Sequence, residues 1–146
     1  MPVLLDAGLP APAHGVFTTR QGGVSAPPRD SLNLGVHVDD AHSKVLENRR
    51  LLAEQLGVDG MAFGKQVHGA GVRVGRGLSN KTSRGLDQTD GLVTSVPGLG
   101  IAVLGADCLP VLLASTSGTP VVGAAHGGRK GLVVGTVLEV VRVMRE

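Results

Sequence analysis

The sequence predicts an α+β fold, in which short strands lie between one early amphipathic helix and a helical stretch near residue 140. Residues 40–56 follow helical spacing, and residues 132–144 form a run long enough for a second helix. Between them, brief runs of aliphatic and β-branched residues alternate with Gly, Pro or Ser. With 146 residues, 42% of them hydrophobic, the chain can bury one core, so we expect one domain over 1–146.

The first third of the chain predicts a strand, a long loop and a helix. Residues 15–19 have strand character, and Gly22-Gly23 and Pro27-Pro28 then mark an exposed loop. Asp39 or Asp40 is the expected N-cap of a helix that runs to Leu56 and ends at Gly57. Its apolar stripe consists of Val45, Leu46, Leu52, Ala53 and Leu56.

The middle of the chain predicts several buried strands. The expected strands are residues 63–67, 72–74, 92–94, 101–106, 111–114 and 121–125. Residues 75–89 are polar and basic, with Arg76, Lys81 and Arg84, which predicts a solvated, mobile connection. Residues 126–131 form a glycine-rich turn before the helix at 132–144, whose nearly continuous apolar character predicts burial against something large.

Composition excludes several classes of protein. The 14 basic and 12 acidic residues nearly balance, which argues against a dedicated nucleic-acid or anionic-membrane binder. Phe17 and Phe63 are the only aromatic residues, too few for a base-stacking platform. The single cysteine excludes an intrachain disulfide and four-thiolate clusters. Residues 1–10 lack signal-peptide character and the apolar stretch at 99–114 contains Asp107 and Pro110, so we expect no membrane span and a cytoplasmic location.

The scarcest residues lie at predicted strand ends. His68 and Cys108 each follow a predicted strand, and His126 lies at the strand-to-helix turn. If the fold brings them together, two imidazoles and one thiolate form a three-ligand zinc site with an open fourth position, typical of catalytic zinc. Two other interpretations stay open: Cys108 as a nucleophile with a histidine base, or a buried cysteine beside hydrogen-bonded histidines. Copper is less favoured, since five histidines and one cysteine cannot ligate the centres of a multicopper oxidase.

Two segments are candidates for anion binding. Gly128 precedes the last helix and is followed by Arg129 and Lys130, so backbone N–H groups and positive charge lie together. The glycines could equally serve the turn alone, with Lys130 a solvated surface residue. Arg20 is the second candidate because a guanidinium matches phosphate oxygens. The remaining histidines carry weaker signals, and we expect His42 to be solvated.

At these residues the sequence resembles the YfiH family of bacterial proteins, also called the laccase-domain or multicopper polyphenol oxidase family. The matching segments follow the family's order from Val16 to Gly131. They are Thr18-Thr19-Arg20 with Gly22-Gly23-Val24-Ser25; Ser31-Leu32-Asn33-Leu34-Gly35 with His37-Val38 and Asn48-Arg49; Gln66-Val67-His68-Gly69; Asp90-Gly91-Leu92-Val93-Thr94; Ala106-Asp107-Cys108-Leu109-Pro110-Val111; and Ala125-His126 with Gly128 and Gly131.

The resemblance implies a layered α/β/β/α-type fold with mixed sheets and a zinc site at His68, Cys108 and His126. It implies phosphorolysis of purine nucleosides such as adenosine, inosine and methylthioadenosine, with adenosine deamination beside it. Purine nucleoside and phosphate are then the partners, and a homo-oligomer is left open. The substrate and phosphate contacts fall on Arg20, Asn33, Gly128, Arg129 and Lys130. Members are also described as peptidoglycan editing factors, so a cysteine-dependent amide hydrolase is the alternative.

Two departures from the family pattern stand out. The family's His-Ala-Gly-Trp-Arg-Gly is here His126-Gly127-Gly128-Arg129-Lys130-Gly131, without the tryptophan and with arginine one place earlier. Family members also continue well past the position of Glu146, which leads to the expectation of a C-terminally truncated relative, active or inactive.

Overall fold

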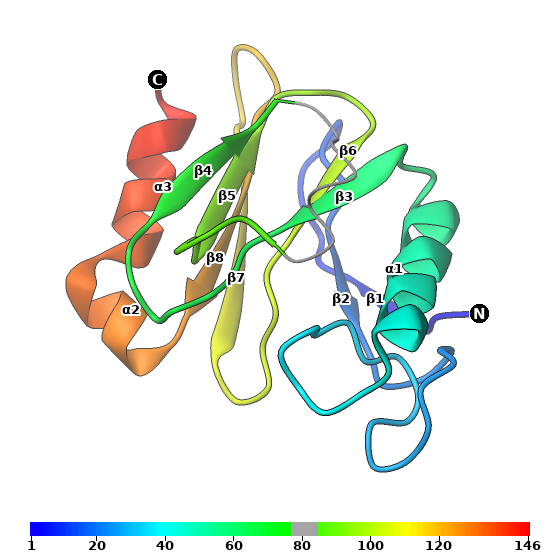
Figure 1. The fold of residues 1–146 in the computed structure, drawn as a ribbon. Helices are drawn as coiled ribbons and strands as arrows, with labels where there is room; N and C mark the ends of the chain where they lie inside the picture. The colour runs from blue at the N-terminus through cyan, green and yellow to red at the C-terminus, as the bar shows by residue number, and fades with distance from the viewer. Residues whose placement is uncertain (77–84) are drawn as a thin grey trace.

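The computed structural model describes residues 1–76 and 85–146, and it places helices at two opposite sides of the molecule with the strands between them (Figure 1). On one side are α2 (Arg129–Val134) and α3 (Thr136–Met144), and on the other is α1 (His42–Leu56). Helices thus enclose strands from two sides, as the predicted layered arrangement requires.

A four-stranded mixed sheet lies against α3. Its strand order is β4 (Val72–Gly75), β5 (Gly91–Thr94), β8 (Val122–Gly127) and β7 (Leu109–Ala114). The β4–β5 pair is parallel, while β8 runs antiparallel to both β5 and β7. All four residues of β5 are buried, which agrees with the apolar pattern of this segment.

Two smaller sheets lie between the four-stranded sheet and α1. Strands β3 (Gly60–Phe63) and β6 (Leu99–Ala102) pair in parallel, and β1 (Leu4–Asp6) pairs antiparallel with β2 (Val16–Thr18). The last paired residues of these two strands are Phe63 and Ala102, and after each of them the polypeptide continues into a loop. Those two loops carry residues of the candidate site.

Glycines on two strands allow α3 to pack closely on the sheet. A Cβ atom on Gly91 or on Gly123 would lie within 2.7 Å of a methyl group of Val140, far inside normal contact distance. Val140 is fully buried and, with Val93 and Ala125, forms one hydrophobic cluster. The sheet and α3 therefore share a tightly packed core.

A second hydrophobic cluster lies beneath α1. It consists of Leu32, Leu34 and Leu52, with Leu4, Leu56, Met61 and Leu104 packed around them. The end of α1 is as predicted, since Gly57 adopts the left-handed conformation (φ 68°) and closes the helix. The predicted N-cap is wrong: Ala41 occupies that position, because the Asp40 carboxylate accepts hydrogen bonds from Ser25 and Asn33.

The buried face of α1 also differs in part from the predicted stripe. Val45 and Leu52 are buried as expected, but Leu46 is 37% exposed. Asn48 and Arg49 are buried in its place. Asn48 hydrogen-bonds to Ser25 and to the backbone of the 23–33 loop, so this polar helix face holds that loop.

The helix predicted at 132–144 is two helices. Gly135 takes a left-handed conformation (φ 89°), ending α2 and starting α3. The predicted burial is also wrong for one face, because Val133 is 82% and Leu138 76% exposed.

Most other predicted strands are present with shifted limits. The strands predicted at 15–19, 72–74, 92–94, 111–114 and 121–125 correspond to β2, β4, β5, β7 and β8. Those at 63–67 and 101–106 end earlier than expected, at Phe63 and Ala102, and β1 was not predicted. Lys81 and Arg84 of the basic connection lie outside the described residues. Among the described helices, none combines the length and the apolar character that a membrane span requires.

Candidate metal centre

His68, Cys108 and His126 meet at one point of the fold. His68 lies in the loop between β3 and β4, Cys108 directly precedes β7, and His126 lies on β8. One potential ligand atom from each residue lies within 4.8 Å of the others, and Cys108 Sγ is 3.9 Å from His68 Nε2. The two imidazole rings are edge to face, with centroids 4.9 Å apart. The sheet topology thus brings together three residues that are separated by 40 and 18 positions in the sequence.

This donor set fits a metal ion. A tetrahedral ion with bonds of about 2.0–2.3 Å keeps its ligand atoms roughly 3.3–3.8 Å apart, close to the 3.9 Å of the Cys108–His68 pair. Gly128 leaves room beside them, since a Cβ atom there would lie 3.0 Å from His68 Cδ2 and 3.1 Å from Cys108 Sγ. Two imidazoles and a thiolate suit zinc and also copper, so the donor set alone does not select the metal.

The buried carboxylate of Asp90 holds both histidines. Its Oδ1 accepts hydrogen bonds from the backbone N–H groups of Val67 and Gly69, at 2.9 and 3.1 Å. Its Oδ2 accepts from the backbone N–H of His68 and from His126 Nδ1, each at 2.9 Å. His68 adopts φ 61°, which is uncommon for a residue with a side chain, and these three N–H contacts fix its loop in that conformation.

The charge state of Asp90 decides the tautomer of His126. Burial raises the pKa of the Asp90 carboxyl, but the hydrogen bonds from Val67, His126, Gly69 and His68 outweigh this effect, so the pKa is lower than usual. The ionised carboxylate can only accept, so Nδ1 of His126 carries the proton. Nε2 of a neutral His126 is then free to bind a metal, the arrangement found in carboxylate–histidine–metal sites.

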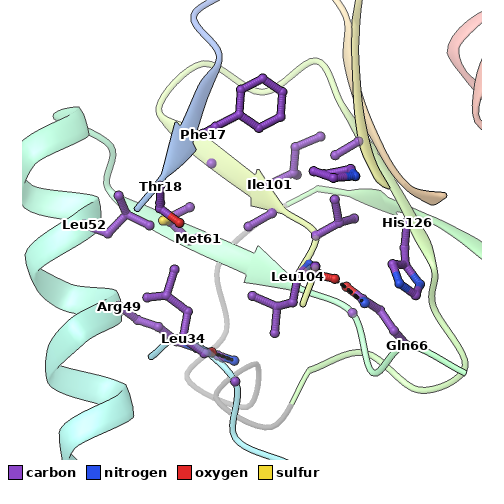
Figure 2. A pocket seen from close by; sticks show the side chains of 18 of the residues that line it. Phe17, Thr18, Leu34, Arg49, Leu52, Met61, Gln66, Ile101, Leu104 and His126 are labelled. Carbon is purple, nitrogen blue, oxygen red and sulfur yellow. Dashed lines mark hydrogen bonds between the residues drawn. The ribbon is translucent and has the colours of Figure 1, made fainter. Parts of the chain in front are cut away.

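A cavity of about 1660 Å³ extends from the three residues toward α1. Figure 2 shows Gln66 and His126 at one end of this cavity and Leu52 and Arg49 at the other. Much of the wall between them is apolar, with Leu34, Met61, Ile101 and Leu104. Most small-molecule sites measure roughly 300–1,000 Å³, so this space is large enough for a small-molecule ligand.

Arg49 brings a positive charge to the far end of the cavity. Its guanidinium lies 3.7 Å from the centre of the Phe63 ring and donates to the backbone carbonyl of Leu34 from both Nε and Nη2. Burial lowers the pKa of Arg49 to about 10, so the group stays charged at neutral pH.

Comparison with known proteins shows the family of this chain. A family model described as multi-copper polyphenol oxidoreductase laccase matches residues 14–146. The chain belongs to this laccase-domain family. It is 49% identical over 137 residues to a Streptomyces coelicolor protein named purine nucleoside phosphorylase, covering 92% of this chain and 55% of that protein. A Mycobacterium tuberculosis protein of the same name is 44% identical over 131 residues, covering 88% of this chain and 51% of the relative.

Two solved structures share the fold of this chain. A Neisseria meningitidis protein, NMB0706, superposes with a TM-score of 0.83 at 37% identity, covering 98% of this chain and 57% of that one. YlmD from Geobacillus stearothermophilus gives a TM-score of 0.83 at 32% identity, with 97% and 56% covered. The mixed α/β fold expected from the resemblance is therefore confirmed. The chain spans about half the length of the curated relatives it matches.

Arg20 and Asn33, expected to contact substrate, line the same cavity but have partners within the chain. Arg20 forms an exposed ion pair with Asp30 at 3.4 Å and also donates to the carbonyl of Asp30. The Asn33 amide donates to Asp40 and to the carbonyl of Gly35. Substrate binding by either residue stays a prediction in this laccase-domain chain.

Gly128 lies beside the three candidate ligands, and the next two residues in the sequence are Arg129 and Lys130. Gly128 is buried in extended conformation against the cluster, and Arg129 begins α2. The side chains of Arg129 and Lys130 are exposed. His42 is exposed at the first position of α1, as predicted.

Two residues of the site were not assigned a role from the sequence. Asp90 and Gln66 belong to segments quoted for the family resemblance, yet nothing in their spacing indicated a contact with the histidines or with the Cys108 loop. The Gln66 amide donates to the carbonyl of Leu104 at 2.8 Å and accepts from the Leu104 N–H at 2.7 Å (Figure 2). A signal available in the sequence was the position of Asp90 immediately before a buried strand, where an unpaired carboxylate would be costly.

Proposed function

We propose that this chain acts as a zinc-dependent purine nucleoside phosphorylase, with the metal ion held by two histidines and one cysteine. The observation that carries the proposal is the convergence of His68, Cys108 and His126 at one end of a large cavity. The 44–49% identity to proteins named purine nucleoside phosphorylase supports the reaction class. Zinc is proposed over copper because three protein ligands with an open fourth position are typical of catalytic zinc, whereas five histidines and one cysteine are too few for the several centres of a multicopper oxidase.

In the proposed reaction, phosphate attacks the anomeric carbon of the nucleoside. The bond from that carbon to the base breaks, a bond to a phosphate oxygen forms, and the base leaves with a proton, giving base and ribose 1-phosphate. A zinc ion held by His68, Cys108 and His126 would supply Lewis acidity. Asp90 keeps His126 in the ligating tautomer, and the apolar side chains of the cavity wall are available to contact the bound nucleoside.

The positive groups near the cavity are proposed to hold phosphate and substrate. Arg129 and Lys130 directly follow Gly128, which lies against the candidate ligands, and their exposed side chains are proposed to bind phosphate. Arg20 can bind an anion by exchanging its exposed partner Asp30, a contact of low energetic value. Asn33 completes the proposed set at the cavity wall.

The decisive assay is incubation of the purified protein with adenosine in the presence and in the absence of phosphate. Phosphorolysis predicts adenine and ribose 1-phosphate only when phosphate is present. Cys108→Ala is the matched control, because it removes one ligand and leaves the cavity wall in place. Adenine formation no greater than in this control contradicts the proposal. Formation of inosine without phosphate would instead indicate the second proposed activity, adenosine deamination.

One contact favours a second candidate function, a cysteine-dependent amide hydrolase. Cys108 Sγ lies 3.9 Å from His68 Nε2, a separation from which a histidine can act as base for a thiol nucleophile. This function predicts hydrolysis of a peptidoglycan-precursor amide after exhaustive chelation and its loss on alkylation of Cys108. Loss of that hydrolysis on chelation alone would favour the metal site.

A further inference from the structure

Gln66 joins the two loops that carry His68 and Cys108. It lies two residues before His68, while its partner Leu104 lies four residues before Cys108. Both backbone polar groups of Leu104 bond to the Gln66 side chain: the N–H donates to Gln66 Oε1, and the carbonyl accepts from Gln66 Nε2. The paired strands β3 and β6 end at Phe63 and Ala102, just before these residues. The side-chain amide of Gln66 thus takes the place of a backbone peptide group and continues the hydrogen bonding between the two segments beyond the last paired residues of β3 and β6.

A tight turn connects Leu104 to Cys108, so the hydrogen bonds that hold Leu104 also restrict the position of Cys108. A Cβ atom on Gly105 would lie 2.7 Å from the carbonyl oxygen of Cys108, so the chain folds back closely between these two residues. On the other side of Cys108, Leu109 pairs with Gly127 in the β7–β8 ladder. Cys108 is therefore held from one side by the sheet and from the other by the Gln66 amide.

The histidines do not depend on this amide in the same way. The backbone of residues 67–69 and the ring of His126 are held by Asp90. Loss of the Gln66 amide should therefore release the 103–107 segment and the Cys108 thiolate, and leave both imidazoles in place.

We propose that Gln66 is a positioning residue of the metal centre, which sets the distance of the Cys108 thiolate from His68 by tying the two ligand loops together. The inference rests on the proposed function insofar as that function includes a metal ion on these ligands. Residues that orient metal ligands typically change metal affinity 10–100-fold when replaced.

The test compares Gln66→Met with wild type and with Gln55→Met. Methionine keeps the length of the side chain and removes both hydrogen bonds, and Gln55 is an exposed glutamine on α1 that serves as the matched control. Zinc affinity is measured by competition with a chromophoric chelator. Cobalt(II) is then added to each protein, because the charge-transfer band of a thiolate–cobalt bond reports specifically on Cys108.

The proposal predicts 10–100-fold weaker zinc binding in Gln66→Met. It also predicts a thiolate–cobalt band that is weaker per bound ion, with Gln55→Met equal to wild type. Unchanged affinity and an unchanged band in Gln66→Met overturn it. A loss of affinity with the thiolate band intact also overturns it, since that indicates a general structural defect.

If Gln66→Met fails to fold, Gln66→Glu is measured in the same way. It retains the acceptor for the Leu104 N–H and loses the donor to the Leu104 carbonyl, and an unchanged affinity and band in this variant overturn the proposal. Absence of metal binding in wild type refutes the metal centre of the proposed function and this inference with it. Metal binding in wild type with no effect at Gln66 refutes the inference alone.

Discussion

Replacement of Gly128 by alanine tests whether the three candidate ligands converge as described. Gly128 has φ −70° and ψ 161°, a conformation that alanine adopts without strain, so the backbone is not perturbed. The added methyl group would lie 3.0 Å from His68 Cδ2, 3.1 Å from Cys108 Sγ and 3.6 Å from His126 Cε1. The substitution therefore places one carbon atom against all three residues at once.

The size of the effect follows from two opposing contributions. Gly→Ala at a compatible backbone position stabilises a protein by about 0.4–1 kcal/mol through the unfolded chain. Overpacking of a dense interior costs about 1–3 kcal/mol, and two contacts here are several tenths of an ångström too short. We expect a net loss of roughly 0.5–2 kcal/mol without metal. Zinc affinity should fall about 10–100-fold, as when ligands are displaced from their positions.

The control is Gly69→Ala, in the loop that carries His68. A Cβ atom there would meet Val67 at 3.7 Å and Asp90 at 3.9 Å, which are ordinary contact distances. Urea unfolding of the metal-free proteins and zinc competition are measured for both variants. If Gly128→Ala matches Gly69→Ala in stability and in zinc affinity, the three side chains do not surround Gly128 as described, and the reasoning is refuted.

Three further predictions concern other groups. Asp90→Asn should lower zinc affinity about 10–100-fold in chelator competition, because an amide no longer fixes the Nδ1–H tautomer of His126; equal affinity would contradict this. Cys108→Ser should reduce the zinc content from about one ion per chain to nearly none by elemental analysis, and full retention would exclude the thiolate as a ligand. Hydrogen bonds from Asn33 and Ser25 lower the pKa of Asp40 below its ordinary value of 3.8, so its contribution to stability is present above the unfolded pKa and is lost as the pH falls through the lower folded pKa. Asp40→Asn should therefore flatten the acid limb of a stability–pH curve, and a limb as steep as that of wild type would count against it.

The candidate ligands could be predicted from the sequence because few residues could carry this chemistry. The chain has a single cysteine, and His68, Cys108 and His126 all lie next to predicted strands. Strand ends converge in sheets, so proximity was a reasonable expectation. The structure brings the three together although His68 lies in a loop and His126 within β8, because the pairing of β8 with both β5 and β7 aligns these segments.

The polar groups that support the ligands could not be predicted in the same way. Asp90 contacts backbone N–H groups 21 to 23 residues away, and such contacts leave no periodic pattern in a sequence. Asp40 is a plausible helix N-cap by residue type, but Ser25 and Asn33 compete for its carboxylate. Gly135 lies within an apolar run that predicts one helix. Its left-handed conformation ends α2 there, so the structure has two helices.

The single carboxylate of Asp90 has a consequence for local opening of the protein. Three amide hydrogens of a surface loop, those of Val67, His68 and Gly69, end on an acceptor that is fully buried at the start of β5. These amides can exchange with solvent only when the loop separates from the sheet. We expect them to exchange about as slowly as amides of the central strands, although Val67 and His68 are exposed. Hydrogen exchange at these three positions therefore reports whether the loop opens independently or only together with the four-stranded sheet.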